Sequence, residues 1–161
     1  MALEIGKPAP DFSGTDDTDR IISLGALRGK WVVLYFYPKD NTPGCSIEAQ
    51  RFEQMLPELS ALNAEVVGVS TDSTGSHAKF RQKCGLSFGL LADSDKSIGK
   101  AYGVIGGLLG MIGIAARESF LIDPSGNLAK HWKMVNPMTH AHEVRQELEA
   151  MQKTAQQKIR A

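Results

Sequence analysis

The sequence is poor in cysteine: only Cys45 and Cys84 occur among its 161 residues. Two cysteines cannot build a disulfide scaffold, and these two do not form the Cys-x-x-Cys pair of a zinc or dithiol site. Net charge is also absent, because 18 Lys and Arg residues balance 18 Asp and Glu residues. This balance creates no field that would attract the chain to nucleic acid or to an acidic membrane.

Long apolar runs are missing as well. The segment 103–116 is uncharged and has five glycines among its 14 residues, but a helix needs about 20 apolar residues to span a bilayer. We therefore expect no transmembrane segment. The start, Met1–Pro8, lacks a basic region followed by an apolar core, so we expect no signal peptide and a cytoplasmic protein. In that compartment an exposed thiol more often has a chemical than a structural role.

The alternation of strand and helix patterns predicts the fold class. Runs of apolar and β-branched residues predict strands at 21–24, 31–37, 65–70 and 88–91, and a hairpin at 119–123 and 128–133. Apolar periodicity and cap residues predict helices at 46–56, 73–84, 95–102 and 140–158, the first with a kink or a second piece at Pro57. We therefore expect a single domain over 1–161, an α/β three-layer sandwich with a central mixed β-sheet.

The most informative stretch runs from Trp31 to Gln50. Its first seven residues are apolar, β-branched or aromatic, which predicts a strand buried on both faces and ended by Pro38. After a turn at Pro43-Gly44 a helix follows, and this places Cys45 in its first turn. Cysteines at helix N-termini react readily as thiolates, because the unpaired amides there favour negative charge. The hydroxyl of Thr42 can point at the same spot; the plainer interpretation is that Cys45 is a buried cap residue.

At these residues the sequence resembles a peroxiredoxin. Pro38-x-x-x-Thr42-x-x-Cys45 matches the peroxidatic motif of that family, and Tyr37-Pro-Lys-Asp-x-Thr-Pro-Gly-Cys45 is similar to its bacterioferritin-comigratory (PrxQ) branch. The resemblance covers nearly the whole chain and implies a thioredoxin-like fold without a cofactor. It implies that Cys45 attacks hydrogen peroxide or an organic hydroperoxide, releases water or an alcohol, and becomes a sulfenic acid. Thioredoxin or another thiol reductant would then regenerate it, in a monomer or weak homodimer.

Two charged residues gain a role from the same resemblance. Arg117, on its own, would be interpreted as an ordinary surface arginine. The active-site arginine of the family matches its position before the hairpin strand, where a guanidinium stabilises a thiolate and donates to a peroxide oxygen. Glu48 lies one turn after Cys45 and would bind that guanidinium; a place on a solvated helix face is the alternative.

The fate of the sulfenic acid depends on Cys84. The resolving position most common in this branch corresponds to Gln50, so a disulfide within one helix cannot form. Some relatives place the resolving cysteine on the following helix, at the position of Arg81, and Cys84 follows three residues later near the same face. Gly85 would let the end of that helix fray. The alternative is that Cys84 fills apolar space and that the enzyme works with one cysteine.

Two further features remain. The apolar segment 103–116 departs from the polar loop usual in this branch, and it could form an apolar lip or subunit contact through Val104, Ile105, Leu108, Leu109, Met111 and Ile112, or fold back onto the core. A non-enzymatic docking or holdase protein using this segment is the alternative function. His131, His140 and His142 lack the spacing of a known metal site, so we expect no metal and prefer helix-start and surface roles.

Overall fold

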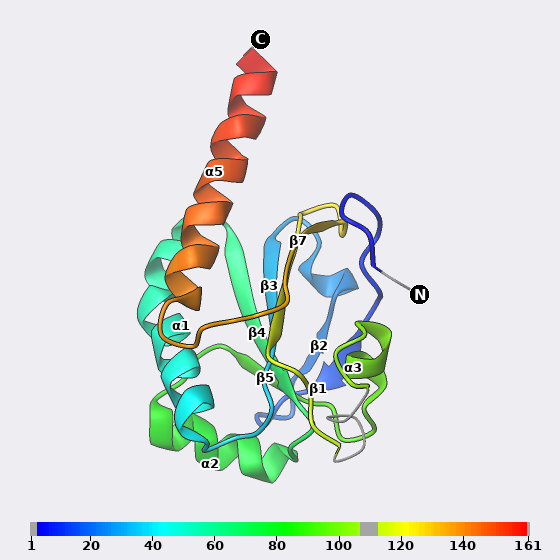
Figure 1. The fold of residues 1–161 in the computed structure, drawn as a ribbon, viewed down its shortest axis with the longest axis vertical. Coiled ribbons are helices and arrows are strands. Elements are labelled where there is room, and N and C mark those ends of the chain that lie inside the picture. Colours follow the sequence, from blue (N-terminus) through cyan, green and yellow to red (C-terminus); the bar gives the residue numbers. More distant parts are fainter. Residues whose placement is uncertain (1–2, 107–112, 161) are drawn as a thin grey trace.

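A five-stranded sheet forms the centre of the structure, a computed structural model that describes residues 3–106 and 113–160, with the side chains of 157–160 excepted (Figure 1). The strand order is β5-β4-β3-β6-β7. Strands β3, β4 and β5 are parallel, whereas β6 runs antiparallel to both β3 and β7. The strands are β3 Trp31–Phe36, β4 Ala64–Ser70, β5 Gly89–Ala92, β6 Glu118–Ile122 and β7 Leu128–Trp132. The expected mixed sheet is therefore confirmed.

Layers cover both faces of this sheet (Figure 1). Helices α1 (Pro43–Ala61), α2 (Thr74–Cys84) and α5 (His140–Arg160) pack on one face. The other face carries α3 (Ser97–Ala101), the 3-10 turn η1 (Gly25–Leu27) and the small hairpin of β1 (Ser13–Thr15) and β2 (Ile21–Ser23). The predicted three-layer α/β sandwich is confirmed.

Strand β3 supplies both halves of the core. Val33 and Tyr35 point into the cluster under α1, α2 and α5, while Leu34 and Phe36 point into the cluster under α3 and the small hairpin. All four side chains are at most 1% exposed. A strand buried on both faces needs apolar residues at every position, so the continuous apolar run was a reliable signal.

The start of α1 differs from the expectation. The helix begins at Pro43 rather than at residue 46, and it continues as one helix through Pro57 to Ala61. Proline is favoured at the first helical position, because its missing N–H would have no partner there and its φ angle already suits the helix. Cys45 is consequently the third helical residue, still inside the first turn. Gly85 caps α2 in the left-handed conformation, as expected (φ 67°).

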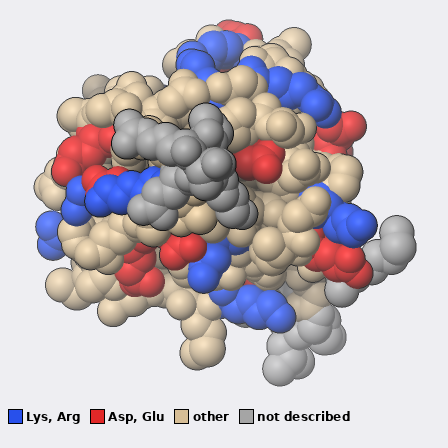
Figure 2. All heavy atoms as spheres, turned by 90° about the horizontal axis from the view of Figure 1, so that it is seen from above, with Lys and Arg blue, Asp and Glu red and all other residues tan. Residues whose placement is uncertain are grey.

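Charged side chains of both signs are interspersed on the face shown in Figure 2, without a large area of one sign. Among residues 3–106 and 113–160, no helix combines the length and the apolar character needed to cross a bilayer. The last turns of α5 extend beyond the rest of the molecule (Figure 1).

Candidate active site

Cys45 lies at the junction between the end of β3 and the start of α1. Thr42 is the N-cap residue, with an extended backbone (φ −83°, ψ 151°). The first helical hydrogen bond runs from the amide of Ser46 to the carbonyl of Thr42. The amides of Gly44 and Cys45 therefore have no carbonyl partner within the helix, and they contribute the positive end of its dipole. Cys45 itself is only 2% exposed.

Arg117 reaches Cys45 from the neighbouring strand. Phe36 pairs with Glu118 in the antiparallel β3–β6 ladder, so Arg117 lies beside the point where the chain leaves β3. Its Nη2 donates to Cys45 Sγ at 3.3 Å. The predicted meeting of these two side chains, 72 residues apart in sequence, is present in the structure. A guanidinium at this distance stabilises a thiolate and can donate to a second anionic atom nearby.

Glu48 holds the other side of the guanidinium. Its Oε1 accepts a hydrogen bond from Arg117 Nη1 at 2.8 Å, and its side chain is 1% exposed. Of the two alternatives for Glu48, the structure therefore shows the guanidinium contact rather than a solvated helix face. Glu48 Oε2 has no hydrogen-bond partner among the described residues.

The environment changes the acidity of this pair. Burial raises the pKa of Glu48 to about 7, against the charge and hydrogen bond of Arg117, which lower it. For Arg117, burial lowers the pKa, but the charges of Glu48 and Cys45 raise it by more, so the guanidinium stays protonated. A permanent cation thus lies between a thiol and a carboxyl group that titrates near neutral pH.

Thr42 departs from its expected orientation. Its hydroxyl donates to the carbonyl of Lys39 at 3.1 Å rather than to Cys45, and it makes no capping hydrogen bond. A hydroxyl has a single proton, so this contact leaves none for the thiol in the observed rotamer. Pro38, half-buried, follows the strand as expected, since β3 ends at Phe36.

Cys84 is the last residue of α2, is half-buried and packs against the same core cluster that contains Cys45. Both cysteines are free, and the start of α1 lies beside α2 (Figure 1). Arg81, the position of the resolving cysteine in some relatives, binds both carboxylate oxygens of Asp17, at 2.7 and 2.8 Å, and the carbonyl of Leu86 at 2.9 Å. These contacts hold the end of α2, so fraying there has to break them.

Two features near the site were missed from the sequence. A Cβ atom at Gly44 would lie 3.1 Å from Arg117 Nη2 and 3.7 Å from Pro137 Cγ, so the glycine leaves room for the guanidinium. Asp40 and His77 form a buried ion pair behind the segment that leads to Cys45. Asp40 was visible inside the peroxiredoxin-like motif, but no spacing rule connects it with a histidine on the next helix.

The three histidines singled out from the sequence have different surroundings. His131 contacts Glu118 at 2.7 Å and stacks on Phe120. His140 does begin α5, but the surface role is wrong: it is fully buried, edge-on to Phe52 and Trp132. Because α1 and α5 pack together, the first turn of α5 is enclosed. Within the described ranges, no cluster of three His, Cys, Asp or Glu side chains is arranged to hold a metal.

The ends of the apolar segment are folded onto the core. Val104 and Ala115 are 2% and 1% exposed, Ile105 packs against the same cluster, and Thr71 Oγ1 donates to the carbonyl of Gly113. At these ends the fold-back alternative holds. The predicted roles of Leu108, Leu109, Met111 and Ile112 lie outside the described residues.

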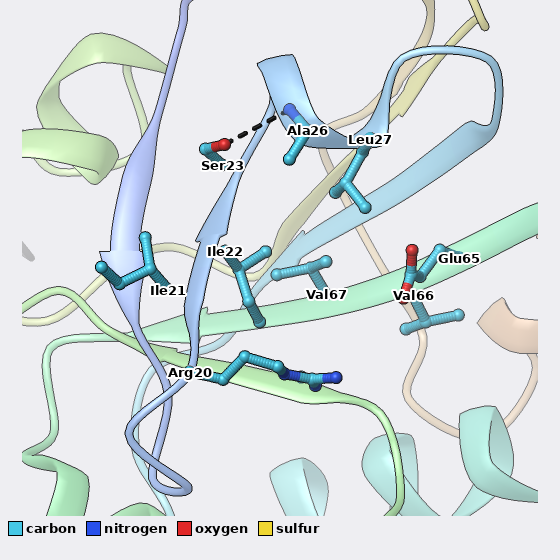
Figure 3. Close-up of a pocket in the computed structure, with 10 residues that line it drawn as sticks. Arg20, Ile21, Ile22, Ser23, Ala26, Leu27, Glu65, Val66 and Val67 are labelled. Carbon is cyan, nitrogen blue, oxygen red and sulfur yellow. Dashed lines mark hydrogen bonds between the residues drawn. The ribbon is translucent and has the colours of Figure 1, made fainter.

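A pocket elsewhere is lined by Arg20 and by residues of β2, η1 and β4, including Ile22 and Val67 (Figure 3). Its volume is about 120 Å³, well below the roughly 300–1,000 Å³ of typical small-molecule sites. None of Pro38, Thr42, Cys45, Glu48 and Arg117 lines it.

The comparisons with known proteins show the family of the chain. The model of the AhpC/TSA family matches residues 5–131, a range that contains Cys45, Glu48 and Arg117. The chain belongs to the AhpC/TSA family. Peroxiredoxin Bcp of Bacillus subtilis (strain 168) is 40% identical to it over 155 residues, which cover 94% of this chain and 98% of that relative.

Solved structures of this family have the same fold. A variant of Xylella fastidiosa PrxQ superposes with a TM-score of 0.88 at 36% identity, covering 94% of this chain and 98% of that chain. The bacterioferritin comigratory protein of Xanthomonas campestris superposes with a TM-score of 0.84 at 34% identity, covering 92% and 99%. The thioredoxin-like fold and the similarity to the PrxQ branch are thereby confirmed. The chain is a thiol-dependent peroxidase that uses a peroxide and a thiol reductant, and the docking or holdase alternative is not favoured.

Proposed function

We propose that Cys45 is the nucleophile of this peroxidase and that Arg117 is its electrostatic partner. The observation that supports the proposal most strongly is the placement of Arg117, which contacts Cys45 Sγ with one nitrogen and Glu48 Oε1 with another. The guanidinium cation and the N-terminus of helix α1, which is the positive end of the helix dipole, both lie at the sulfur atom of Cys45. Such preorganised donors stabilise negative charge as it moves from the sulfur to a peroxide oxygen.

The chemical step follows from this arrangement. The Cys45 thiolate attacks the terminal oxygen of ROOH, the O–O bond breaks, and RO⁻ takes up a proton to leave as an alcohol or as water. Cys45 is oxidised to a sulfenic acid and the peroxide is reduced. Arg117 binds the peroxide oxygens, and Glu48 keeps its guanidinium in place. The hydroxyl of Thr42 turns from the Lys39 carbonyl to the bound peroxide.

The substrates are hydrogen peroxide and organic hydroperoxides. Alkyl peroxide reduction is the activity of the Xanthomonas campestris relative that shares this fold. Thioredoxin is the reductant that fits a disulfide product best, because its dithiol has a low reduction potential and catalytic disulfides are more easily reduced than structural ones. A cycle of this kind needs a compartment that keeps thiols reduced, which favours the cytoplasm.

Cys84 resolves the sulfenic acid in this proposal. Its thiol attacks the Cys45 sulfur, water leaves, and an intramolecular disulfide remains for the reductant. The support is that both cysteines face one core cluster beneath adjacent helices. Cys84→Ser should replace the disulfide with over-oxidised Cys45. The same sulfenic or sulfinic product in wild type and in Cys84→Ser would exclude Cys84 as the resolving cysteine.

The whole chain is one domain, and it acts as a monomer or weak homodimer. Both core clusters share the single sheet, so neither half of the chain has a core of its own. Within the described ranges, few large apolar side chains are well exposed: Ile5, Ile21, Met134 and Met138. Sedimentation at several concentrations tests this state, and a stable dimer at micromolar concentration would contradict it.

Peroxide turnover by three variants tests the proposal. Cys45→Ser should abolish turnover while the fold is kept, since the two side chains are similar in size. Arg117→Gln should lower the second-order rate constant by about 10²-fold, the usual effect of losing one preorganised donor. Arg145→Gln is the matched control, because Arg145 also pairs with carboxylates but on α5. Turnover that survives in Cys45→Ser would refute the assignment.

A further inference from the structure

A buried ion pair lies behind the segment that leads to Cys45. His77, on α2, places its Nδ1 2.7 Å from Asp40 Oδ2, and the two side chains are 0% and 1% exposed. The other ring nitrogen, Nε2, lies 2.9 Å from the carbonyl oxygen of Leu91 on β5. Carboxylate and carbonyl oxygens only accept, so both contacts are satisfied together when both ring nitrogens carry a proton. The arrangement therefore suits an imidazolium, enclosed in the protein opposite a carboxylate.

Asp40 is held by more than the histidine. Its Oδ1 accepts from the Tyr37 hydroxyl at 2.7 Å, and its Oδ2 also accepts from the Ser76 hydroxyl at 2.8 Å. Its backbone amide donates to Asp72 Oδ2 at 2.8 Å. Asp40, in the connection between β3 and α1, thus forms hydrogen bonds with Tyr37 just after β3, with α2 and with the turn after β4. Among residues 38–42, only Asp40 makes several side-chain hydrogen bonds.

This position decides what the ion pair can do. Asp40 lies two residues before the N-cap Thr42 and five before Cys45, within the short connection that sets where α1 begins. Thr42 in turn bonds to the carbonyl of Lys39, the residue next to Asp40. A shift of Asp40 would therefore be passed to the cap and to the first turn of α1. Arg117, just before β6, contacts the sulfur directly and is itself held by Glu48 of α1.

We propose that His77 is a positioning residue for Cys45, which acts through Asp40 to hold the 38–42 segment and the first turn of α1 in the reactive geometry. The inference rests on the proposed role of Cys45. His77 touches neither the sulfur nor the substrate in this scheme. The pair is costly to break, because removing one partner leaves the other charge buried without compensation.

Because His77 is charged only when it is protonated, the effect of the Asp40–His77 pair should depend on pH. The groups that face its ring are Tyr37, which directly follows β3, Asp40 from the connection, Asp72 from the turn after β4, and the Leu91 carbonyl from β5. Burial lowers the pKa of His77, but the hydrogen bond and charge of Asp40 raise it by more, so the net shift is upward from 6.5. The charged Asp40–His77 pair is consequently fully present below pH 6.5 and is lost as the pH rises through the raised pKa of His77.

The test measures the rate constant for Cys45 oxidation by hydrogen peroxide in His77→Gln, from pH 6 to pH 9. We expect the variant to react on the order of ten- to a hundred-fold more slowly at pH 6, as a misplaced nucleophile does. The wild-type rate constant should fall on the alkaline side as His77 loses its proton, and this fall should be missing in His77→Gln. The double variant Asp40→Asn/His77→Gln should be no slower than the slower single variant, because the pair acts as a unit.

Asp16→Asn is the matched control. Asp16 is also a fully buried carboxylate and accepts from the amides of Thr18 and Arg20. Its side-chain hydrogen bonds stay within residues 16–20, and only its backbone bridges to Leu91, so the substitution changes no side-chain contact of the Asp40–His77 pair. The Asp16→Asn variant should be less stable than wild type, but its folded molecules should keep the wild-type rate constant for Cys45 oxidation and the wild-type pH profile.

Two milder variants keep the test decisive if His77→Gln does not fold. Tyr37→Phe and Ser76→Ala each remove one hydrogen bond to Asp40 and leave the ion pair, so each should slow oxidation by a smaller factor. Folded His77→Gln with the wild-type rate and pH profile, or unchanged rates in both milder variants, would overturn the inference. Failure of the proposed function is a different result, namely turnover that survives in Cys45→Ser.

Discussion

Replacement of Glu48 by glutamine should stabilise the protein at alkaline pH. Glu48 is 1% exposed, and burial raises its pKa from 4.5 to about 7 even though Arg117 opposes the shift. Between these two values the folded protein holds a proton that the unfolded chain has already lost. The free energy of unfolding therefore falls as the pH rises across this window, and the full penalty is present above pH 7.

The size of the effect follows from the pKa change. One unit of pKa corresponds to about 1.4 kcal/mol, so the penalty approaches about 3 kcal/mol at pH 8 and is less than about 1 kcal/mol at pH 5. Glu48→Gln removes it and keeps an acceptor for Arg117. The new amide group, left where Oε2 has no partner, costs about 1 kcal/mol at every pH. The difference between wild type and variant should thus change by about 2–3 kcal/mol between pH 5 and pH 8.

Urea unfolding of both proteins at pH 5 and pH 8 measures this change. Glu65→Gln is the control, since Glu65 is 40% exposed and its contact with Lys30 is 3.8 Å long, so its loss should cost less than about 1 kcal/mol. An equal difference between wild type and Glu48→Gln at both pH values would show that the buried carboxyl keeps its ordinary acidity. The account of the Arg117–Glu48 pair would then be wrong.

Two further predictions concern His140 and Gly44. Burial lowers the pKa of His140 to about 4, so the free energy of unfolding should fall by about 3 kcal/mol as the pH drops from 6.5 to 4. His140→Phe should lack this loss, and the control His142→Gln should keep it. The same dependence of the unfolding free energy on pH in all three proteins would contradict the burial argument. Gly44→Ala should push Arg117 away from Cys45, because the new Cβ would lie 3.1 Å from Nη2. We expect about ten-fold slower peroxide reduction at unchanged melting temperature, and a wild-type rate would show that the guanidinium has room to move.

Local patterns predicted the parts of the structure that neighbouring residues decide. The run of apolar residues before Pro38 identified the central strand, because a strand covered on both sides cannot alternate. Gly85 identified the end of α2, because few other residues adopt the left-handed cap conformation without strain. The start of α1 was placed three residues late, since Pro43 was interpreted as part of a turn although it also suits the first helical position.

Long-range contacts could not be predicted in the same way. Arg117 was assigned only through the resemblance to peroxiredoxins, because its approach to Cys45 depends on the β3–β6 register. Asp40 and His77 are 37 residues apart, and the burial of His140 depends on how α5 packs on α1. Such contacts arise from the packed fold and have no periodicity or short motif in the chain.

The most direct test of the central claim is the intact mass of the protein, with peptide mapping, after one equivalent of hydrogen peroxide and no reductant. The account predicts that all oxidation involves Cys45: a product lighter by two hydrogen atoms in wild type, with Cys45 joined to Cys84, and oxygen added to Cys45 in Cys84→Ser. Oxidation confined to Cys84, or no reaction at Cys45 in folded protein, would contradict it.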